Sequence, residues 1–114
     1  MSTPAAPHPI IPREKLNFGL DGDIARFWFE GDPFKTRALD ALSIIFPPGE
    51  KFFMNCVRDF RDQITDAKLL QEIKDFNRQE AQHSMVHRQD NDRLRKQGID
   101  VDRLTKYVED LMEK

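Results

Sequence analysis

Apolar residues recur at steps of three and four along most of the chain, a spacing that is typical of amphipathic helices. This spacing predicts helices over residues 34–46, 50–64 and 67–97, and a short fourth helix capped by Asp100. In the first stretch the pattern is carried by Phe34, Ala38, Ala41, Leu42 and Ile45. Because no run alternates between apolar and polar residues as a strand does, the sequence predicts an all-α fold.

Local signals mark the ends of these helices. Asp32-Pro33 predicts a helix start, since aspartate accepts hydrogen bonds from the first turn and proline needs no partner there. Pro47-Pro48-Gly49 is expected to stop the first helix, because proline removes a helical hydrogen bond. Thr65-Asp66 predicts the start of the long third helix and Gly98 its end.

The N-terminal segment has a different composition. Four of the seven prolines, Pro4, Pro7, Pro9 and Pro12, fall in the first twelve residues, a density that forbids a helix. We therefore expect an extended Pro-rich arm over residues 1–20 and one helical domain over residues 21–114. A chain of 114 residues suits a single domain with a thin core.

Composition limits the classes of binding partner and the cellular compartment that we expect. Lysine and arginine number 18 against 20 acidic residues, a net charge of −2 that argues against nucleic-acid and membrane-surface binding. A single cysteine, Cys56, excludes an intrachain disulfide framework and a Cys-rich zinc module. No apolar run is long enough to span a membrane and no signal peptide is recognisable, so we expect a cytoplasmic protein.

The predicted third helix carries polar groups on its apolar face. Leu69, Ile73, Phe76 and Leu94 form the apolar stripe. The same face carries Glu80, His83, His87 and Asn91. A stripe that should be buried is thus interrupted by ionisable side chains, which need partners when they leave water.

A divalent metal ion is the simplest common partner for these groups. Glu80-x-x-His83 places two ligands one turn apart, and Glu50 belongs to the core-facing side of the preceding helix. A Glu-x-x-His pair joined by a glutamate from another helix is the half-site of carboxylate-bridged di-metal bundles. The sequence therefore predicts metal ligands Glu50, Glu80 and His83.

Simpler interpretations account for the same residues one at a time. Glu80 and His83 could form an exposed ion pair near a helix end. Glu50 could simply favour the positive end of a helix dipole. His87 could be a hydrogen-bonded histidine of the core or its rim.

Three longer segments resemble the predicted metal-dependent hydrolase family of bacteria. They are "FWFEGDP", "ALSIIFPPGE", which ends in Glu50, and "QEAQH", which contains Glu80 and His83. The similar region runs over about residues 26–98. The resemblance implies a ferritin-like helical bundle around a metal site, with Glu50, Glu80 and His83 as ligands and His87 beside them, where we expect it to move protons in catalysis.

The chain departs from that family in one respect. Family members look longer, and their second half should supply matching ligands, whereas no histidine follows His87 here. We therefore expect a ferritin-like half-bundle of three to four helices. Its other half is expected to be encoded elsewhere or to come from a second copy in a homodimer, unless the chain is a degenerate relic.

Two classes of function remain open at this stage. The first is an enzyme: a hydrolase acting on an unidentified small molecule with iron, manganese or zinc, or a di-iron oxidase or oxygenase using the same ligands. The second is a helical metal-binding or interaction module without a reaction.

Overall fold

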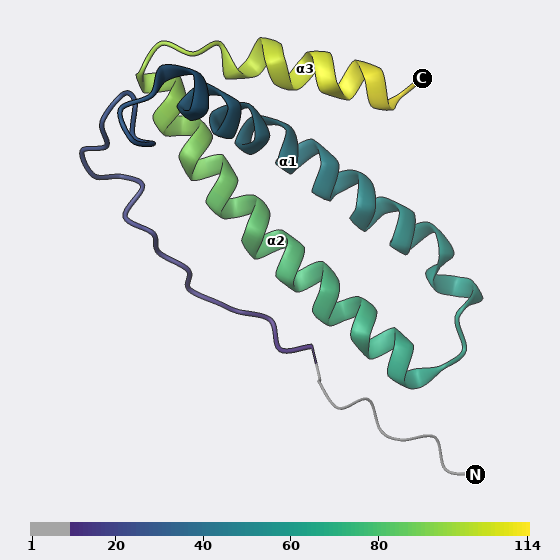
Figure 1. Ribbon diagram of the computed structural model, residues 1–114. Coiled ribbons are helices and arrows are strands. Elements are labelled where there is room, and N and C mark those ends of the chain that lie inside the picture. The colour runs from purple at the N-terminus through teal and green to yellow at the C-terminus, as the bar shows by residue number, and fades with distance from the viewer. Residues whose placement is uncertain (1–9) are drawn as a thin grey trace.

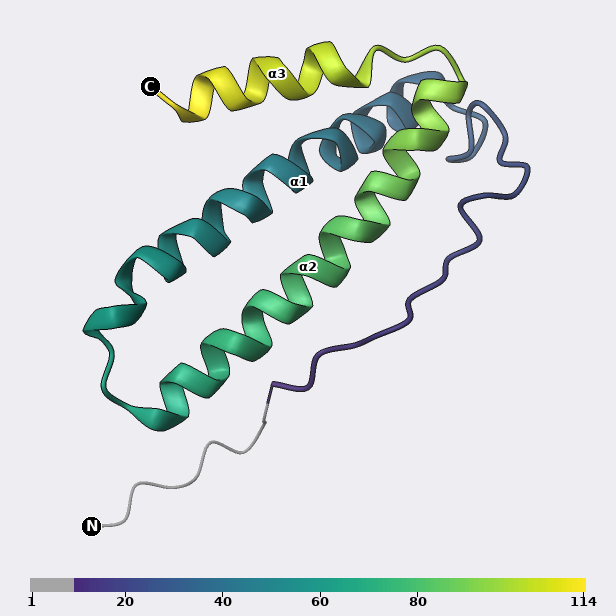
Figure 2. The same ribbon diagram turned by 180° about the vertical axis from the view of Figure 1, so that it is seen from behind.

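The computed structural model describes residues 10–114, so the first nine residues of the expected arm lie outside the described residues. The elements are α1 (Pro33–Phe60), a short 3-10 turn (Arg61–Gln63), α2 (Ala67–Lys96) and α3 (Val101–Met112). No strand occurs in this range, and the all-α prediction is confirmed. The long helices α1 and α2 form an antiparallel hairpin, and α3 folds back along α1 (Figures 1 and 2).

The predicted helix ends are confirmed where they depend on local signals. Asp32, Asp66 and Asp100 each accept a hydrogen bond at their N-cap, from the backbone N–H groups of Lys35, Leu69 and Arg103. Gly98 has a φ of +89°, the left-handed conformation that a glycine adopts without strain after a helix.

The predicted break at the two prolines is wrong, because α1 runs through Pro47 and Pro48 as one helix. Without an N–H group, Pro47 cannot bond to the carbonyl four residues back, which is that of Ser43. Asn91 on α2 replaces the lost donor, with its Nδ2 atom 3.2 Å from the Ser43 carbonyl oxygen. This hydrogen bond from α2 therefore offsets part of the stability that a proline inside a helix costs.

The face that α1 buries is polar. Thr36, Asp40, Ser43 and Glu50 are at most 6% exposed, whereas Phe34 is 83% exposed. Few apolar residues are buried: Ile44, Leu94 and Val101 form a small cluster with Ile99 packed against it, and Ile73 is buried outside that cluster. The apolar pattern of residues 34–46 thus predicted a helix correctly, but it did not identify the side turned towards α2.

An extended segment before α1 lies along α2 (Figure 1). The backbone N–H of Arg13 donates to Gln79 Oε1 at 2.8 Å, and Glu14 pairs with Arg78. Gln97 donates to the carbonyl of Ile24 at 3.3 Å. Among the described residues no helix is long and apolar enough to cross a membrane.

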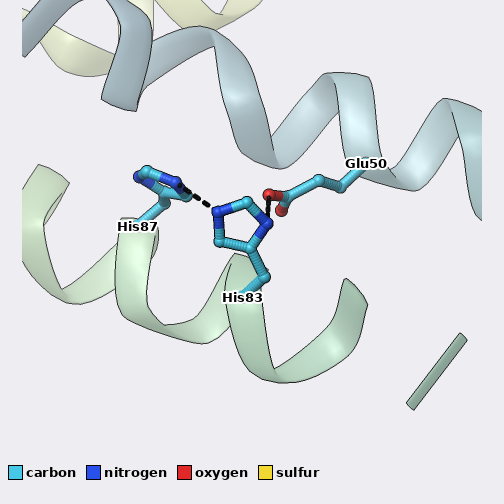
Figure 3. Close-up of side chains that lie close together, drawn as sticks. All are labelled: Glu50, His83 and His87. Carbon is cyan, nitrogen blue, oxygen red and sulfur yellow. Dashed lines mark hydrogen bonds and ion pairs between the residues drawn. The ribbon is translucent and has the colours of Figure 1, made fainter. Parts of the chain in front are cut away.

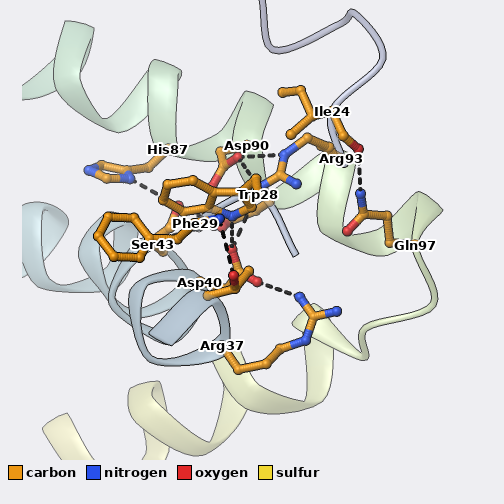
Figure 4. Close-up of polar contacts among 12 residues, drawn as sticks. Ile24, Trp28, Phe29, Arg37, Asp40, Ser43, His87, Asp90, Arg93 and Gln97 are labelled. Atoms are coloured by element: carbon orange, nitrogen blue, oxygen red, sulfur yellow. Dashed lines mark hydrogen bonds and ion pairs between the residues drawn. The ribbon is translucent and has the colours of Figure 1, made fainter. Parts of the chain in front are cut away.

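A buried ionic cluster joins this segment to both long helices (Figure 4). The Asp40 carboxylate accepts a hydrogen bond from Trp28 Nε1 at 3.0 Å and pairs with Arg37 and Arg93. Arg93 also pairs with Asp90 at 2.7 Å. Because the two arginines balance the two aspartates, the cluster carries no net charge.

Trp28→Phe is expected to lower the free energy of unfolding by about 1.5–3 kcal/mol, the usual contribution of a hydrogen bond to a charged group. The variant keeps an aromatic ring but leaves Asp40 with one donor fewer. Urea unfolding measures the change, with Phe34→Leu as the control, since Phe34 is exposed and should change stability by less than about 0.5 kcal/mol. Equal urea midpoints for Trp28→Phe and wild type would contradict this role.

Candidate metal centre

Glu50, His83 and His87 meet between the two long helices (Figure 3). Glu50 projects from α1, and the histidines project from successive turns of α2. One potential ligand atom from each side chain lies within 4.8 Å of the other two. The structure thus brings Glu50 next to His83, with His87 beside them.

His83 is the central member of this group. Its Nδ1 atom lies 2.8 Å from Glu50 Oε1, and its Nε2 atom lies 2.9 Å from His87 Nε2. The side chain of His83 is 49% exposed, whereas that of Glu50 is only 5% exposed. The group is therefore open to solvent through the ring of His83 and closed at the carboxylate.

The Glu50 carboxylate has an incomplete environment. Both oxygens are buried, and within residues 10–114 neither accepts a well-formed hydrogen bond, although His83 is close enough to form an ion pair. Burial raises the pKa of Glu50, and the adjacent His83 and the hydroxyl of Ser84 only partly oppose the rise. A buried carboxylate with few hydrogen bonds is costly, and a cation beside its oxygens would lower that cost.

His87 is suited to bind a cation as a neutral imidazole. Burial lowers its pKa and the neighbouring His83 lowers it further, while Asp90 has a weaker opposite effect. The ring of Phe46 packs against the imidazole, with 4.8 Å between ring centroids. Because metals bind the unprotonated ring nitrogen, this environment favours the ligand form of His87.

Glu80 lies at the edge of the group. Its Oε2 atom is 3.8 Å from His83 Nδ1, and its side chain is 20% exposed. The three side chains that come together most closely are Glu50, His83 and His87, so the structure places His87 where the sequence analysis expected Glu80. The ligand role of Glu80 and the catalytic role of His87 stay predictions.

The sequence pattern of a family described as predicted metal-dependent hydrolases matches residues 12–114. The chain belongs to this family. A search of curated proteins and a search of solved structures found no match. The family description and the donor set agree, because two imidazoles and a carboxylate are common ligands of divalent metals in hydrolases.

Behind the candidate metal centre lies a hydrogen-bonded pair that the sequence analysis did not assign. Ser43 Oγ lies 3.0 Å from His87 Nδ1 and 3.1 Å from Asn91 Oδ1 (Figure 4 shows the contact with His87). Ser43 and Asn91 are buried. Asn91 had stood out on the polar face of α2, but Ser43 had not. The sequence feature that could have pointed to Ser43 is its position, four residues before Pro47 and two helical turns before Glu50.

A cavity of about 530 Å³ opens beside the histidines of the candidate metal centre. Its walls come from the extended segment, α1 and α2, and they include Leu20, Trp28, Leu42, Phe46 and Val86. The ionisable side chains in its lining are His83, His87, Asp90 and Arg93, and Arg93 is paired with Asp90. The cavity is thus largely apolar, with its polar chemistry at the candidate metal centre.

Proposed function

We propose that the protein is a metal-dependent hydrolase in which Glu50, His83 and His87 hold a divalent cation. The observation that carries the proposal is the buried carboxylate of Glu50, which faces a pair of histidines and has no hydrogen bond of good geometry to either oxygen within residues 10–114. A divalent cation held there supplies Lewis acidity, polarising the scissile bond and lowering the pKa of a water molecule. We assign Glu80 as a further ligand, since its carboxylate borders His83.

The residues around the centre would have different roles in such a reaction. Glu50 is buried and His87 is half-buried, and together they would anchor the cation between α1 and α2. The exposed ring of His83 faces the entrance, so substrate and water reach the centre from that side. Phe46 and the apolar wall restrict water elsewhere, which strengthens electrostatic interactions at the reacting bond.

We propose that the substrate is uncharged and largely apolar, with its hydrolysable bond next to the histidines. The apolar walls of the cavity support this, because binding pockets match the polarity of their ligands. Arg93 is the only lysine or arginine in the lining, and it is already paired with Asp90. A phosphate or a nucleotide would therefore find no free cationic side chain among these residues.

The test starts from protein purified without added metal or chelator. Elemental analysis is expected to find a divalent metal, and aryl esters of short and long straight-chain acids serve as substrates. We expect hydrolysis to cease on chelation, to return with zinc or manganese, and to show kcat/KM rising with chain length. Cys56→Ser is a control that should keep activity, whereas His83→Ala should lose it.

Other outcomes of this experiment would contradict hydrolysis. Bound metal without turnover of any ester would favour a non-catalytic module. Oxygen consumption on ferrous loading would favour a di-iron oxidase or oxygenase.

We also propose that two copies pair as a homodimer and bring Glu50, Glu80 and His83 from each copy to a shared centre. The flat arrangement of helices supports this, since the Cα atoms extend over 56 × 33 × 22 Å. Apolar side chains on α1 are left exposed, namely Phe34, Phe52, Phe53 and Phe60.

Light scattering with and without metal is expected to give about twice the 13.4 kDa mass of the chain. A 13.4 kDa species that binds metal and is active would contradict the dimer. It would leave the centre within one chain intact, so the two proposals can be separated.

A further inference from the structure

The contacts behind His87 form a continuous chain of polar atoms from α2 to α1 and back. His87 Nδ1 lies 3.0 Å from Ser43 Oγ, which lies 3.1 Å from Asn91 Oδ1. Asn91 Nδ2 lies 3.2 Å from the carbonyl oxygen of Ser43. Ser43 is 6% exposed and Asn91 is 4% exposed, so water competes little for these hydrogen bonds.

The carbonyl of Ser43 decides how the Asn91 amide is oriented. A carbonyl oxygen can only accept hydrogen bonds, so the amide atom facing it must be the NH₂ group. The Ser43 carbonyl is free for this contact because Pro47, four residues later, has no N–H to donate to it. With NH₂ turned to the carbonyl, the oxygen of the amide faces the Ser43 hydroxyl.

The amide orientation in turn decides where the serine hydrogen goes. An amide oxygen accepts only, so the hydroxyl of Ser43 donates its one hydrogen to Asn91. Its oxygen is then left to accept from His87, which requires the hydrogen on Nδ1. In that tautomer the lone pair lies on His87 Nε2, the atom 2.9 Å from His83.

We propose that Ser43 and Asn91 are positioning residues that hold His87 as the tautomer with hydrogen on Nδ1, leaving Nε2 to bind the cation. The inference rests on the proposed metal-binding function for its purpose, but the tautomer itself exists without metal. Partners behind a metal-binding histidine commonly fix its tautomer and ring orientation in this way. Pro47 inside α1 then also has a role at the site, because its missing N–H leaves the Ser43 carbonyl free to orient Asn91.

The tautomer is measured on chelator-treated protein by ¹⁵N–¹H NMR of the histidine rings. In the wild type we expect His87 to carry its hydrogen on Nδ1, with Nε2 unprotonated. Ser43→Ala removes the acceptor and should shift His87 towards the Nε2-protonated form. Ser43→Thr keeps a hydroxyl and should restore the wild-type spectrum.

Zinc affinity provides the second measurement. Ser43→Ala is expected to weaken binding by about 10–100-fold, the usual effect of removing a partner behind a metal ligand, and Ser43→Thr should recover most of it. Thr36→Val is the matched control, since Thr36 is a buried hydroxyl on the same helix that bonds Phe29 instead. It should change neither the tautomer nor the affinity.

Two results would overturn the inference: a wild-type His87 with hydrogen on Nε2, or a Ser43→Ala protein that folds with unchanged tautomer and zinc affinity. If Ser43→Ala does not fold, Asn91→Ala decides instead: without the amide oxygen the Ser43 hydroxyl is free to donate to His87 Nδ1, which should shift His87 towards the Nε2-protonated form, and an unchanged tautomer would overturn the inference. A wild type that binds no zinc but shows the Nδ1 tautomer would refute the proposed function and leave the role of Ser43 standing.

Discussion

Glu50→Gln is expected to weaken divalent-metal binding by more than about 100-fold and, in the absence of metal, to stabilise the protein at neutral pH. The affinity falls because a charged oxygen ligand is replaced by a neutral amide, and residues that merely support ligands already contribute 10–100-fold. Stability rises because the variant removes a buried negative charge whose oxygens have no hydrogen bonds of good geometry, while keeping the shape of the side chain. The same substitution thus has opposite effects on binding and on folding.

The difference in stability between Glu50→Gln and the wild type depends on pH. Burial raises the pKa of Glu50 above its ordinary value of 4.5, so the ionised form is disfavoured in the folded state. The stability that this group contributes is fully present below pH 4.5 and is lost as the pH rises through its folded-state pKa. We therefore expect wild type and Glu50→Gln to have similar melting temperatures at pH 4 and the variant to melt higher at pH 7–8.

Thermal unfolding of chelator-treated protein at several pH values measures this difference. Glu109→Gln on α3 is the matched control, because Glu109 is exposed and its charge should not produce the same dependence on pH. A metal-free Glu50→Gln protein that melts below the wild type at pH 7–8 would show that the carboxylate is stabilised by the fold itself. The argument for a cation at Glu50 would then fail.

The helices were predictable because their signals are local. Asp32, Asp66 and Asp100 cap the helices that follow them, and each cap needs only the next three residues. The continuity of α1 through Pro47 was not predictable, because the replacement donor comes from Asn91, 48 residues from the serine whose carbonyl it contacts. A contact between distant residues thus overrode a strong local signal.

The grouping of side chains at the candidate metal centre was predictable in outline for a similar reason. Helical spacing placed Glu50 on the inner side of its segment, and His83 and His87 on one face of the next helix. Which carboxylate lies closest to the histidines depends on how α1 and α2 slide past each other, and that register is set by packing. The sequence therefore identified Glu50 and His83 but did not rank His87 above Glu80, and it overlooked Ser43, whose role exists only once Asn91 is beside it.

Zinc is expected to raise the melting temperature of the wild type strongly, and His83→Ala should abolish most of that rise. A ligand present at about 1,000 times its Kd stabilises the folded state by about 4.1 kcal/mol. For a domain of this size that corresponds to roughly 15 °C or more. His83 is the residue to replace, because it contacts both Glu50 and His87, and because a side chain that is 49% exposed can be shortened without emptying a core.

Melting curves over a zinc titration make the test quantitative. The metal-free His83→Ala protein should melt close to the metal-free wild type, which separates lost binding from lost folding. Cys56→Ser is the control for zinc bound through the only thiol of the chain, and it should keep the full stabilisation. Equal stabilisation of wild type and His83→Ala would place the cation away from the two histidines. The buried Glu50 would then need another partner, since burying an ionised carboxylate with few hydrogen bonds lowers the stability of the fold.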